Sequence, residues 1–469
     1  MTASTCSTIT VTPFSTSTSS SVGLIDIFEK VAHQTGSIIL DTAGSSQSDG
    51  RYNIMLWNPV TTVTATHDNK VTICHQDGSQ FDTDLNPFEA THSYLHKKIE
   101  HLTFAHNAND KIQALPFVVG VAGFAGYDTG RYYERLPANA QSDVTTPDFI
   151  AGLYLQSLIE DTQTGEIFYC SAEGLTAPVD IPDKTTHTPF ALSSTWQSNL
   201  TQEEYISRIQ RIHKYLRAGD CYQVNMAQRF SARFTGSPWH AYRVLRDSNQ
   251  APFSAYIQCD DSAILSISPE RFLRVKNGMV ETKPIKGTRP RSGSQEQDKK
   301  NAQSLLNAEK DRAENLMIVD LLRNDISKHC KPHSVKVPSL FALESYQAVH
   351  HLVSTITGEL NDGSTPLHLL ASAFPGGSIT GAPKIRAMEI IDELEKHRRN
   401  IYCGSIFYMG FRQDMDSSIC IRTILAHKNQ LHCWAGGGIV LDSLAQDEYK
   451  ETLDKVSKIL PVLEQFFGR

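Results

Sequence analysis

The chain has 469 residues, of which 40% are hydrophobic and 20% charged, and its formal net charge is −7. This balance is typical of a soluble enzyme with a sizeable core, and the length allows roughly two to four domains. The acidic excess offers no general attraction to nucleic acid or to an anionic membrane, and no apolar run approaches the roughly 20 residues needed to span a bilayer. We therefore expect neither a nucleic acid nor a membrane as partner.

The N-terminal segment and the cysteines both indicate a cytoplasmic protein. Residues 1–21 are rich in Ser and Thr, and the first charged residue is Asp26. Because a secretory signal needs a basic region and a transit peptide needs arginines, we expect a disordered tail over 1–21. Nine cysteines are scattered without a C-x-x-C pair or the spacing of zinc ligands, so we interpret them as reduced thiols.

Three segments follow the tail. Short strand-like runs alternate with turns over 22–175 and predict a sheet-rich N-terminal subdomain. A Pro-, Thr- and Asp-rich stretch over 176–198 is the expected linker. Residues 199–469 form the expected catalytic domain. Strands and helices mix without a regular βαβ period, which indicates an α+β fold with large mixed or antiparallel sheets and surrounding helices.

The best-marked helix opens the C-terminal domain. It begins with a capping box formed by Thr201 and Glu204 and ends at Gly219. A hairpin over 264–288 is expected to fold at Asn277-Gly278. The remaining long elements are a strand over 221–230, a helix over 299–328, a strand over 417–426 and a helix over 447–467 that is broken or kinked near Pro461.

Two carboxylate pairs lie on the predicted long helices. Asp311 precedes Glu314 by three residues, and Glu448 precedes Glu451 by three, so each pair shares one helix face. Such pairs suit a hard cation, and Mg²⁺ takes a few carboxylates together with waters and a substrate oxygen. A solvated acidic face would show the same spacing. Lys455, four residues after Glu451, adds a cation for an anionic substrate and favours a site.

Other residues suggest a place for anionic groups. The run Gly436-Gly437-Gly438 could expose backbone N–H groups as an anion-binding nest, or could simply mark a tight bend. Arg422 lies in an apolar predicted strand, so it pairs either with a protein carboxylate or with a ligand carboxylate. By pattern alone, His351 is more typical of a structural histidine than of a catalytic one.

Glu270 and Lys286 lie on the two arms of the predicted hairpin. A lysine is a nucleophile only when partly deprotonated, and a glutamate with a raised pKa is a general acid. An ordinary cross-strand ion pair is the alternative. A two-residue loop at Asn277-Gly278 would pair residue 270 with 285 and leave Lys286 on the other face. We predict a three-residue loop or a bulge, which returns both side chains to one face.

Four segments together resemble one family. They are GDCYQVN at 219–225, DRAENLMIVDLLRND at 311–325, GGSITGAPK at 376–384 and AGGGIV at 435–440. Over about 201–463, and more loosely in the first half, the chain resembles the chorismate-utilising enzymes. This resemblance implies a fold like that of anthranilate synthase component I.

The resemblance also implies roles for individual residues. It implies a Mg²⁺ site made by Glu314, Glu448 and Glu451, with Asp311 close behind. It implies that chorismate is bound by Arg422, Tyr402, Lys455 and the amides of Gly436, Gly437 and Gly438, in a pocket lined further by His351, Thr380 and Gln223.

Two positions distinguish the branches of the family. In the family that this chain resembles, isochorismate and salicylate synthases carry a lysine that activates water. This chain has Gln223 at that position. Anthranilate synthases usually carry alanine in the Pro-Ile-x-Gly-Thr motif, where this chain has Lys286. The resemblance therefore implies the branch that aminates chorismate at C4 with ammonia to give 4-amino-4-deoxychorismate, toward 4-aminobenzoate and folate. Lys286 would add to ring C2, with Glu270 as the acid.

The family resemblance implies partners as well. No cysteine lies in a G-x-C-x-G nucleophile setting, so ammonia is either free or supplied by a glutamine amidotransferase subunit. Relatives hold tryptophan in a pocket of the first half, and residues 40–42 and 50–52 lie near that place, without the Leu-Leu-x-Ser form. Two alternatives remain open: anthranilate synthase component I, and a non-catalytic chorismate-binding subunit.

Overall fold

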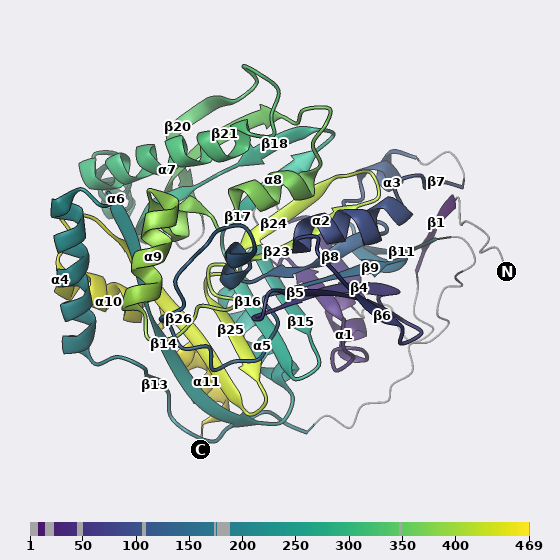
Figure 1. The fold of residues 1–469 in the computed structure, drawn as a ribbon, viewed down its shortest axis with the longest axis horizontal. Coiled ribbons are helices and arrows are strands. Elements are labelled where there is room, and N and C mark those ends of the chain that lie inside the picture. The colour runs from purple at the N-terminus through teal and green to yellow at the C-terminus, as the bar shows by residue number, and fades with distance from the viewer. Residues whose placement is uncertain are drawn as a thin grey trace.

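The computed structural model describes residues 8–14, 23–44, 50–105, 109–172, 175, 188–346 and 349–468. Within them, two large sheets carry most of the chain and helices pack around both (Figure 1). Nearly all strand pairs are antiparallel, and the parallel exception is the short β1–β7 pair. The predicted α+β fold is confirmed.

The first sheet has 14 strands. Its order is β12 (Ala191–Leu192), β14 (Gln223–Thr235), β26 (Gln430–Ile439), β25 (Thr423–His427), β16 (Ser262–Ser268), β15 (Phe253–Gln258), β2 (Ile38–Asp41), β3 (Tyr52–Leu56), β10 (Gln156–Asp161), β11 (Glu166–Ala172), β1 (Thr8–Pro13) and β7 (Thr103–Phe104), with β13 (Gln197–Ser198) and β22 (Gly381–Ala382) paired to β14.

The second sheet has 12 strands. Its order is β19 (Ile285–Pro290), β21 (Val349–Glu359), β18 (Met279–Thr282), β17 (Arg271–Lys276), β24 (Met415–Ile419), β23 (Ser405–Gly410), β8 (Gly120–Ala125), β9 (Phe149–Tyr154), β4 (Thr61–Thr66), β5 (Lys70–His75) and β6 (Gln80–Thr83), with β20 (Lys336–Ser345) paired to β21.

Strands from both halves of the chain share each sheet. In the first sheet β2 of the N-terminal half pairs with β15, and in the second β8 pairs with β23. The two expected subdomains therefore do not have separate sheets, and the predicted linker lies mostly outside the described residues. The expectation of a tail over 1–21 is wrong for residues 8–13, because the β-branched run of β1 pairs with β11 and buries Ile9.

Helices cover the sheets at their faces and ends. They are α1 (Leu24–Glu29), α2 (Pro87–Ala90), α3 (Asp110–Ala114), α4 (Gln202–Ala218), α5 (Pro238–Asn249), α6 (Gln295–Leu306), α7 (Glu309–Ser327), α8 (Pro366–Ala373), α9 (Lys384–Leu394), α10 (Ala445–Val456) and α11 (Leu460–Phe467). Short π and 3₁₀ turns lie at Thr91–Leu95, His96–Lys98, Tyr127–Tyr132 and Gly377–Ile379. Figure 1 shows α6 and α7 beside β20 and β21, and α4 beside α10 near the end of β26.

Several predicted helix ends are confirmed. The capping box of Thr201 and Glu204 opens α4, and Gly219 closes it in the left-handed conformation with φ of 78°. The predicted helix over 447–467 is broken, with Pro461 in the first turn of α11. The predicted single helix over 299–328 is wrong, because the backbone leaves helical geometry at Ala308 and separates α6 from α7.

The predicted strand over 417–426 is also wrong in one respect. It is two strands that belong to different sheets, β24 and β25, and Arg422 lies between them with φ of 52°. A left-handed residue cannot continue a strand, so the chain turns there from one sheet into the other. This crossing carries Arg422 to the border of the two sheets.

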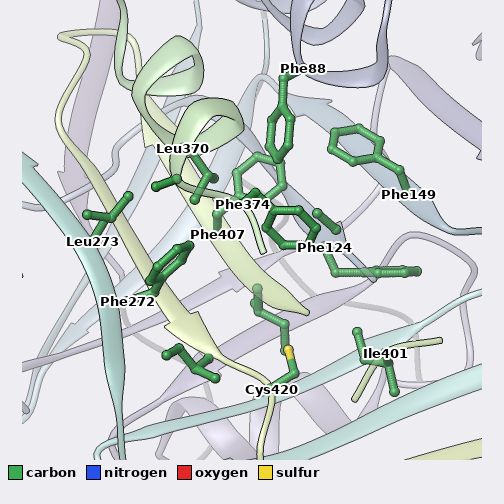
Figure 2. Close-up of a cluster of buried hydrophobic side chains, with 14 of the residues drawn as sticks. Phe88, Phe124, Phe149, Phe272, Leu273, Leu370, Phe374, Ile401, Phe407 and Cys420 are labelled. Carbon is green, nitrogen blue, oxygen red and sulfur yellow. The ribbon is translucent and has the colours of Figure 1, made fainter. Parts of the chain in front are cut away.

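Two apolar clusters form the core. Alternating residues of the 14-stranded sheet face opposite sides, so Ile38 and Leu425 join a large cluster with the second sheet, while Ile39 and Ile424 join α1, α5 and α11. Figure 2 shows part of the large cluster, where aromatic rings from α2, β8, β9 and β23 meet. Within the described part of the chain, no helix is long and apolar enough to cross a membrane.

Candidate active site

A cavity of about 590 Å³ lies at the border of the two sheets. Its volume is within the usual range for a small-molecule site. The β26 edge, β19, α7 and α10 all contribute to its wall. It is lined by Asn225, Pro269, Glu270, Ile285, Lys286, Gly287, Thr288, Arg289, Lys310, Asp311, Glu314, His351, Ser378, Ile379, Tyr402, Ile421, Arg422, Trp434, Ala435, Gly436, Gly438, Glu448, Glu451, Asp454, Lys455 and Val456.

Glu270 and Lys286 both line this cavity, as predicted, but the cause is not the predicted loop. Lys276 pairs with Met279, so the loop at Asn277-Gly278 has two residues, and the three-residue loop, one of the two predicted forms, is wrong. The other predicted form, a bulge, agrees with the register shift in β17 next to Glu270. The regular hairpin ends at Thr282, and β19 pairs with β21 instead of β17. Register shifts lie between residues 271 and 274 of β17, against β24, and between 286 and 288 of β19, against β21.

The Glu270 carboxyl is poised as an acid. The residue is only 8% exposed, and burial raises its pKa from 4.5 to about 7, against the opposing charges of Lys286, Lys455 and Arg422. A carboxyl with such a pKa keeps its proton for a large fraction of the time near neutral pH. Glu270 therefore has the protonation state that a general acid needs, in the cavity that Lys286 also lines.

The acidic side chains of α7 and α10 converge on the same cavity. The Lys310 ammonium lies 3.9 Å from a Glu314 carboxylate oxygen and 3.6 Å from a Glu448 oxygen, so one cation already lies between the two helices. Burial raises the pKa of Glu314 and of Glu448, and the neighbouring lysines oppose this shift in both. Ser443 donates a 2.6 Å hydrogen bond to Glu448 and orients that carboxyl.

Glu451 differs from these two carboxyls. Burial opposes its ionisation, but the Lys455 ammonium at 2.6 Å, with smaller contributions from the charges of Lys286 and Lys310, leaves the pKa of Glu451 lowered. Gly437 faces this group: a Cβ there would lie 3.0 Å from a Glu448 oxygen and 3.3 Å from a Glu451 oxygen. Any side chain at Gly437 would therefore fill the space that the two carboxylates border.

The glycine run is a strand edge and not the proposed nest. Residues 436–438 continue β26 and pair with 225–227 of β14, whereas β25 pairs with β26 only as far as Cys433. The Gly436 carbonyl accepts a 2.7 Å hydrogen bond from Lys455, so its peptide groups point away from β14. In an antiparallel pair, the peptide groups of every second residue point to the same side, so those of Gly438 point the same way as those of Gly436. The N–H groups of both glycines therefore lie on the side of β26 where β25 no longer pairs.

Arg422, Tyr402 and His351 also line the cavity. Among the described residues, no carboxylate lies within ion-pair distance of the Arg422 guanidinium, which favours the ligand-binding interpretation over a protein salt bridge. Tyr402 is 3% exposed and stacks on Trp434 with centroids 6.3 Å apart. Burial lowers the pKa of His351 to about 4, so this imidazole is neutral at pH 7 and exchanges a 2.9 Å hydrogen bond with Thr288.

Two predicted pocket residues lie behind the wall. Thr380 is fully buried, and its hydroxyl donates to the Gly376 carbonyl at 2.9 Å, which holds the turn whose Ser378 and Ile379 line the cavity. Gln223 is fully buried too, and a Cβ on Gly438 would lie 2.7 Å from its amide nitrogen. Both polar atoms of the Gln223 amide have no hydrogen-bond partner within the described structure.

Asn225, Lys310, Ser378 and Trp434 are among the cavity residues that were not predicted as site residues from the sequence. Lys310 had a detectable signal, since it lies four residues before Glu314. Asn225 and Ser378 lie inside segments that were singled out, but nothing in the local pattern distinguished them from their neighbours.

The sequence matches the model of the chorismate binding enzyme family over residues 38–461. The chain belongs to this family. It is 48% identical over 440 residues to an aminodeoxychorismate synthase component 1 of Salmonella typhimurium (strain LT2), covering 93% of this chain and 95% of that protein. The corresponding Escherichia coli (strain K12) protein is 44% identical over 441 residues, covering 93% and 95%.

A solved member of the family has the same fold. The crystal structure of anthranilate synthase component I from Streptococcus pneumoniae TIGR4 matches with a TM-score of 0.73 at 30% identity, covering 87% of this chain and 92% of that one. The expected fold like that of anthranilate synthase component I is confirmed.

This chorismate binding enzyme has carboxylates of the kind that Mg²⁺ prefers. In the part of the chain that the structure describes, no group of three or more His, Cys, Asp or Glu side chains is arranged to hold a metal ion. Mg²⁺ commonly keeps several waters and takes one or two protein carboxylates. Oxygen donors from two helices, raised pKa values at Glu314 and Glu448, and the space left by Gly437 fit such an ion.

A second cavity of this family member, about 340 Å³, lies near the tryptophan site expected from the resemblance. Leu40, Asp41 and Thr42 from β2 and its end line it, together with Arg51 and Tyr52 at the start of β3. Arg51 is paired with Asp161 at 2.7 Å, and its guanidinium lies 4.9 Å from the Tyr52 ring centroid.

Proposed function

We propose that this chain aminates chorismate at C4 with ammonia to give 4-amino-4-deoxychorismate, toward 4-aminobenzoate and folate. Relatives 44–48% identical over 93% of the chain are named aminodeoxychorismate synthase component 1. The observation that carries the proposal is the convergence of Lys286 and Glu270, whose pKa is raised to about 7, in a cavity with Arg422 and the acidic face of α7 and α10.

Each reacting group has a defined task. The neutral amine of Lys286 attacks ring C2, the double bonds shift toward C4, and the C4 hydroxyl leaves as water with the proton of Glu270. Ammonia then attacks C4, the double bonds shift back, and the C2–lysine bond breaks. Lys286 and Glu270 are thereby restored after proton transfer from the new amine, and the enolpyruvyl group stays on the ring.

The charges of the cavity match a dicarboxylate substrate. Arg422 and the free N–H groups of Gly436 and Gly438 are donors for one carboxylate. Glu314, Glu448 and Glu451, with Asp311 beside them, would hold Mg²⁺, which supplies positive charge to the other carboxylate when it is bound. His351, neutral at pH 7, adds no charge of its own but fills the wall beside Thr288.

Ammonia is expected to come from a partner. The relatives are named component 1, which implies a second component. We propose a glutamine amidotransferase subunit, since hydrolysis of glutamine supplies the nucleophile that this reaction needs.

The second cavity is proposed to hold tryptophan. Its mixture of apolar walls, Tyr52 and charged groups suits an amphipathic aromatic amino acid. Thermal unfolding with and without tryptophan tests this assignment: tryptophan should raise the melting temperature of the wild type. An Arg51→Ala variant whose melting temperature rises by the same amount would contradict it.

Product identification tests the main proposal against its alternatives. The purified chain is incubated with chorismate, Mg²⁺ and ammonium at alkaline pH, and the product is identified by mass. We expect an amine that retains the enolpyruvyl group. Fluorescent anthranilate, which has lost that group, would instead identify an anthranilate synthase, and no turnover would identify a non-catalytic chorismate-binding subunit.

A further inference from the structure

A buried ion pair lies directly behind one wall of the active-site cavity. The side chains of Arg399 and Glu395 are 1% and 4% exposed, and their closest N–O distance is 2.6 Å. Two buried charges are retained only where their remaining hydrogen-bonding atoms also find partners. Here those partners are backbone groups and one side chain of the cavity wall.

Arg399 joins three wall segments. Its guanidinium donates to the Ile379 carbonyl at 2.9 Å and to the Asn225 carbonyl at 2.9 Å, and its charge lies 5.5 Å from the Tyr402 ring centroid. Glu395 accepts a further 2.9 Å hydrogen bond from the Ala227 backbone on β14. The pair therefore sets the spacing between β14, the turn after α8, and Tyr402.

One contact goes beyond holding the backbone. Arg399 Nη2 donates to the Asn225 side-chain oxygen at 3.1 Å. An amide has an acceptor end and a donor end, so engaging the oxygen with a cation determines which end is left over. Among the described residues, none accepts a hydrogen bond from Asn225 Nδ2, and Asn225 lines the cavity beside its cross-strand neighbour Gly438.

We propose that Asn225 contacts the substrate through its amide N–H, and that Arg399, held by Glu395, is the positioning residue that keeps this donor turned toward the cavity. The inference rests on the proposed function only in taking chorismate as the ligand. The chemical partner of Asn225 is an oxygen acceptor of the substrate. A donor at this place disfavours ligands that present a group unable to accept a hydrogen bond there, such as an ammonium, so Asn225 contributes to specificity.

Equilibrium dialysis with chorismate and Mg²⁺, without ammonia, measures the contact directly. Asn225→Asp keeps the shape of the side chain and replaces its donor by an acceptor, so we expect binding to weaken by about tenfold or more. Asn324→Asp, an exposed change on α7, is the matched control and should bind like the wild type. Binding of Asn225→Asp within twofold of the wild type would overturn the inference.

A double-mutant cycle tests the positioning role of Arg399. Arg399→Lys keeps the charge but not the planar fork, and should weaken binding in the wild-type background. In an Asn225→Ala background it should have little further effect, because the donor is already gone. Equal weakening in both backgrounds would overturn the positioning role, and if Arg399→Lys fails to fold by circular dichroism, Asn225→Asp alone decides. Wild-type protein that binds no chorismate would instead refute the proposed function.

Discussion

Glu270 and Lys286 face one cavity although the two-residue turn between their strands would place them on opposite faces of a regular hairpin. The register of β17 shifts between Arg271 and Arg274, and β19 pairs with β21 instead of continuing the hairpin. Burial raises the pKa of Glu270 to about 7, and the charge of Lys286 is the largest influence that opposes this rise. An acid and an amine that line the same ligand cavity form the chemical centre of the proposed reaction.

Replacing Lys286 by alanine should remove most of the amination and leave the fold intact. The covalent route is lost with the amine, and we expect a decrease in kcat of at least about a hundredfold. The matched control is Lys283→Ala, whose side chain pairs with Glu344 at 2.8 Å and is not part of the cavity wall. Near-normal turnover of Lys286→Ala, measured by product formation with ammonia, would refute the covalent route.

The rate should fall as the pH rises through the pKa of Glu270. The acid must be protonated to act, and its pKa is raised to about 7, so kcat/KM should decline above about pH 7 when free NH₃ is held constant. In Glu270→Gln this decline should disappear, and the overall rate should drop by roughly 10² to 10⁴. A variant with the same pH profile as the wild type would assign the decline to another group.

The same pKa shift should reduce stability at neutral pH. The folded state holds a proton that the unfolded state, with a pKa of 4.5, has released, so stability should fall as the pH rises from 4.5 to about 7. Glu270→Gln should gain stability relative to the wild type between pH 5 and pH 8, by up to about 3 kcal/mol. Urea unfolding at pH 5 and at pH 8 measures this gain. Glu296→Gln, a change at an exposed position, is the control. An equal gain in the control variant would contradict the explanation.

Glu314 is expected to be a ligand of Mg²⁺. Its carboxyl is largely buried among other acids, so Glu314→Gln should weaken the apparent affinity for Mg²⁺ in activity titrations by at least about tenfold. In the presence of chorismate, Mg²⁺ should raise the melting temperature of the wild type, and this rise should be smaller in Glu314→Gln. Glu309→Gln, on the exposed first turn of the same helix, provides the comparison. Identical metal titrations for the two variants would exclude the ligand role.

Local signals in the sequence predicted the parts of the fold that depend on neighbouring residues. The capping box of Thr201 and Glu204 and the break at Pro461 were both found because their causes lie within a few residues. The acidic residues of α7 and α10 were recognised by their spacing and by the family resemblance. These features need no knowledge of which strands meet.

Long-range packing determined what the sequence did not predict. Apolar residues run through Arg422 without a glycine or proline, so nothing locally marks the point where the chain leaves one sheet for the other. The orientation of the Asn225 amide depends on Arg399, 174 residues away. Thr380 was placed on the wall by its motif, but its hydroxyl is used to hold the turn beside the cavity.

The most direct test of the account is a search for the Lys286 adduct. Enzyme incubated with chorismate and Mg²⁺ in the absence of ammonia is quenched and its intact mass is measured, followed by peptide mapping. The account predicts a fraction of protein heavier by the mass of chorismate less one water, with the modification on Lys286 and absent from Lys286→Ala. Unmodified protein that nevertheless forms 4-amino-4-deoxychorismate when ammonia is added would contradict the account.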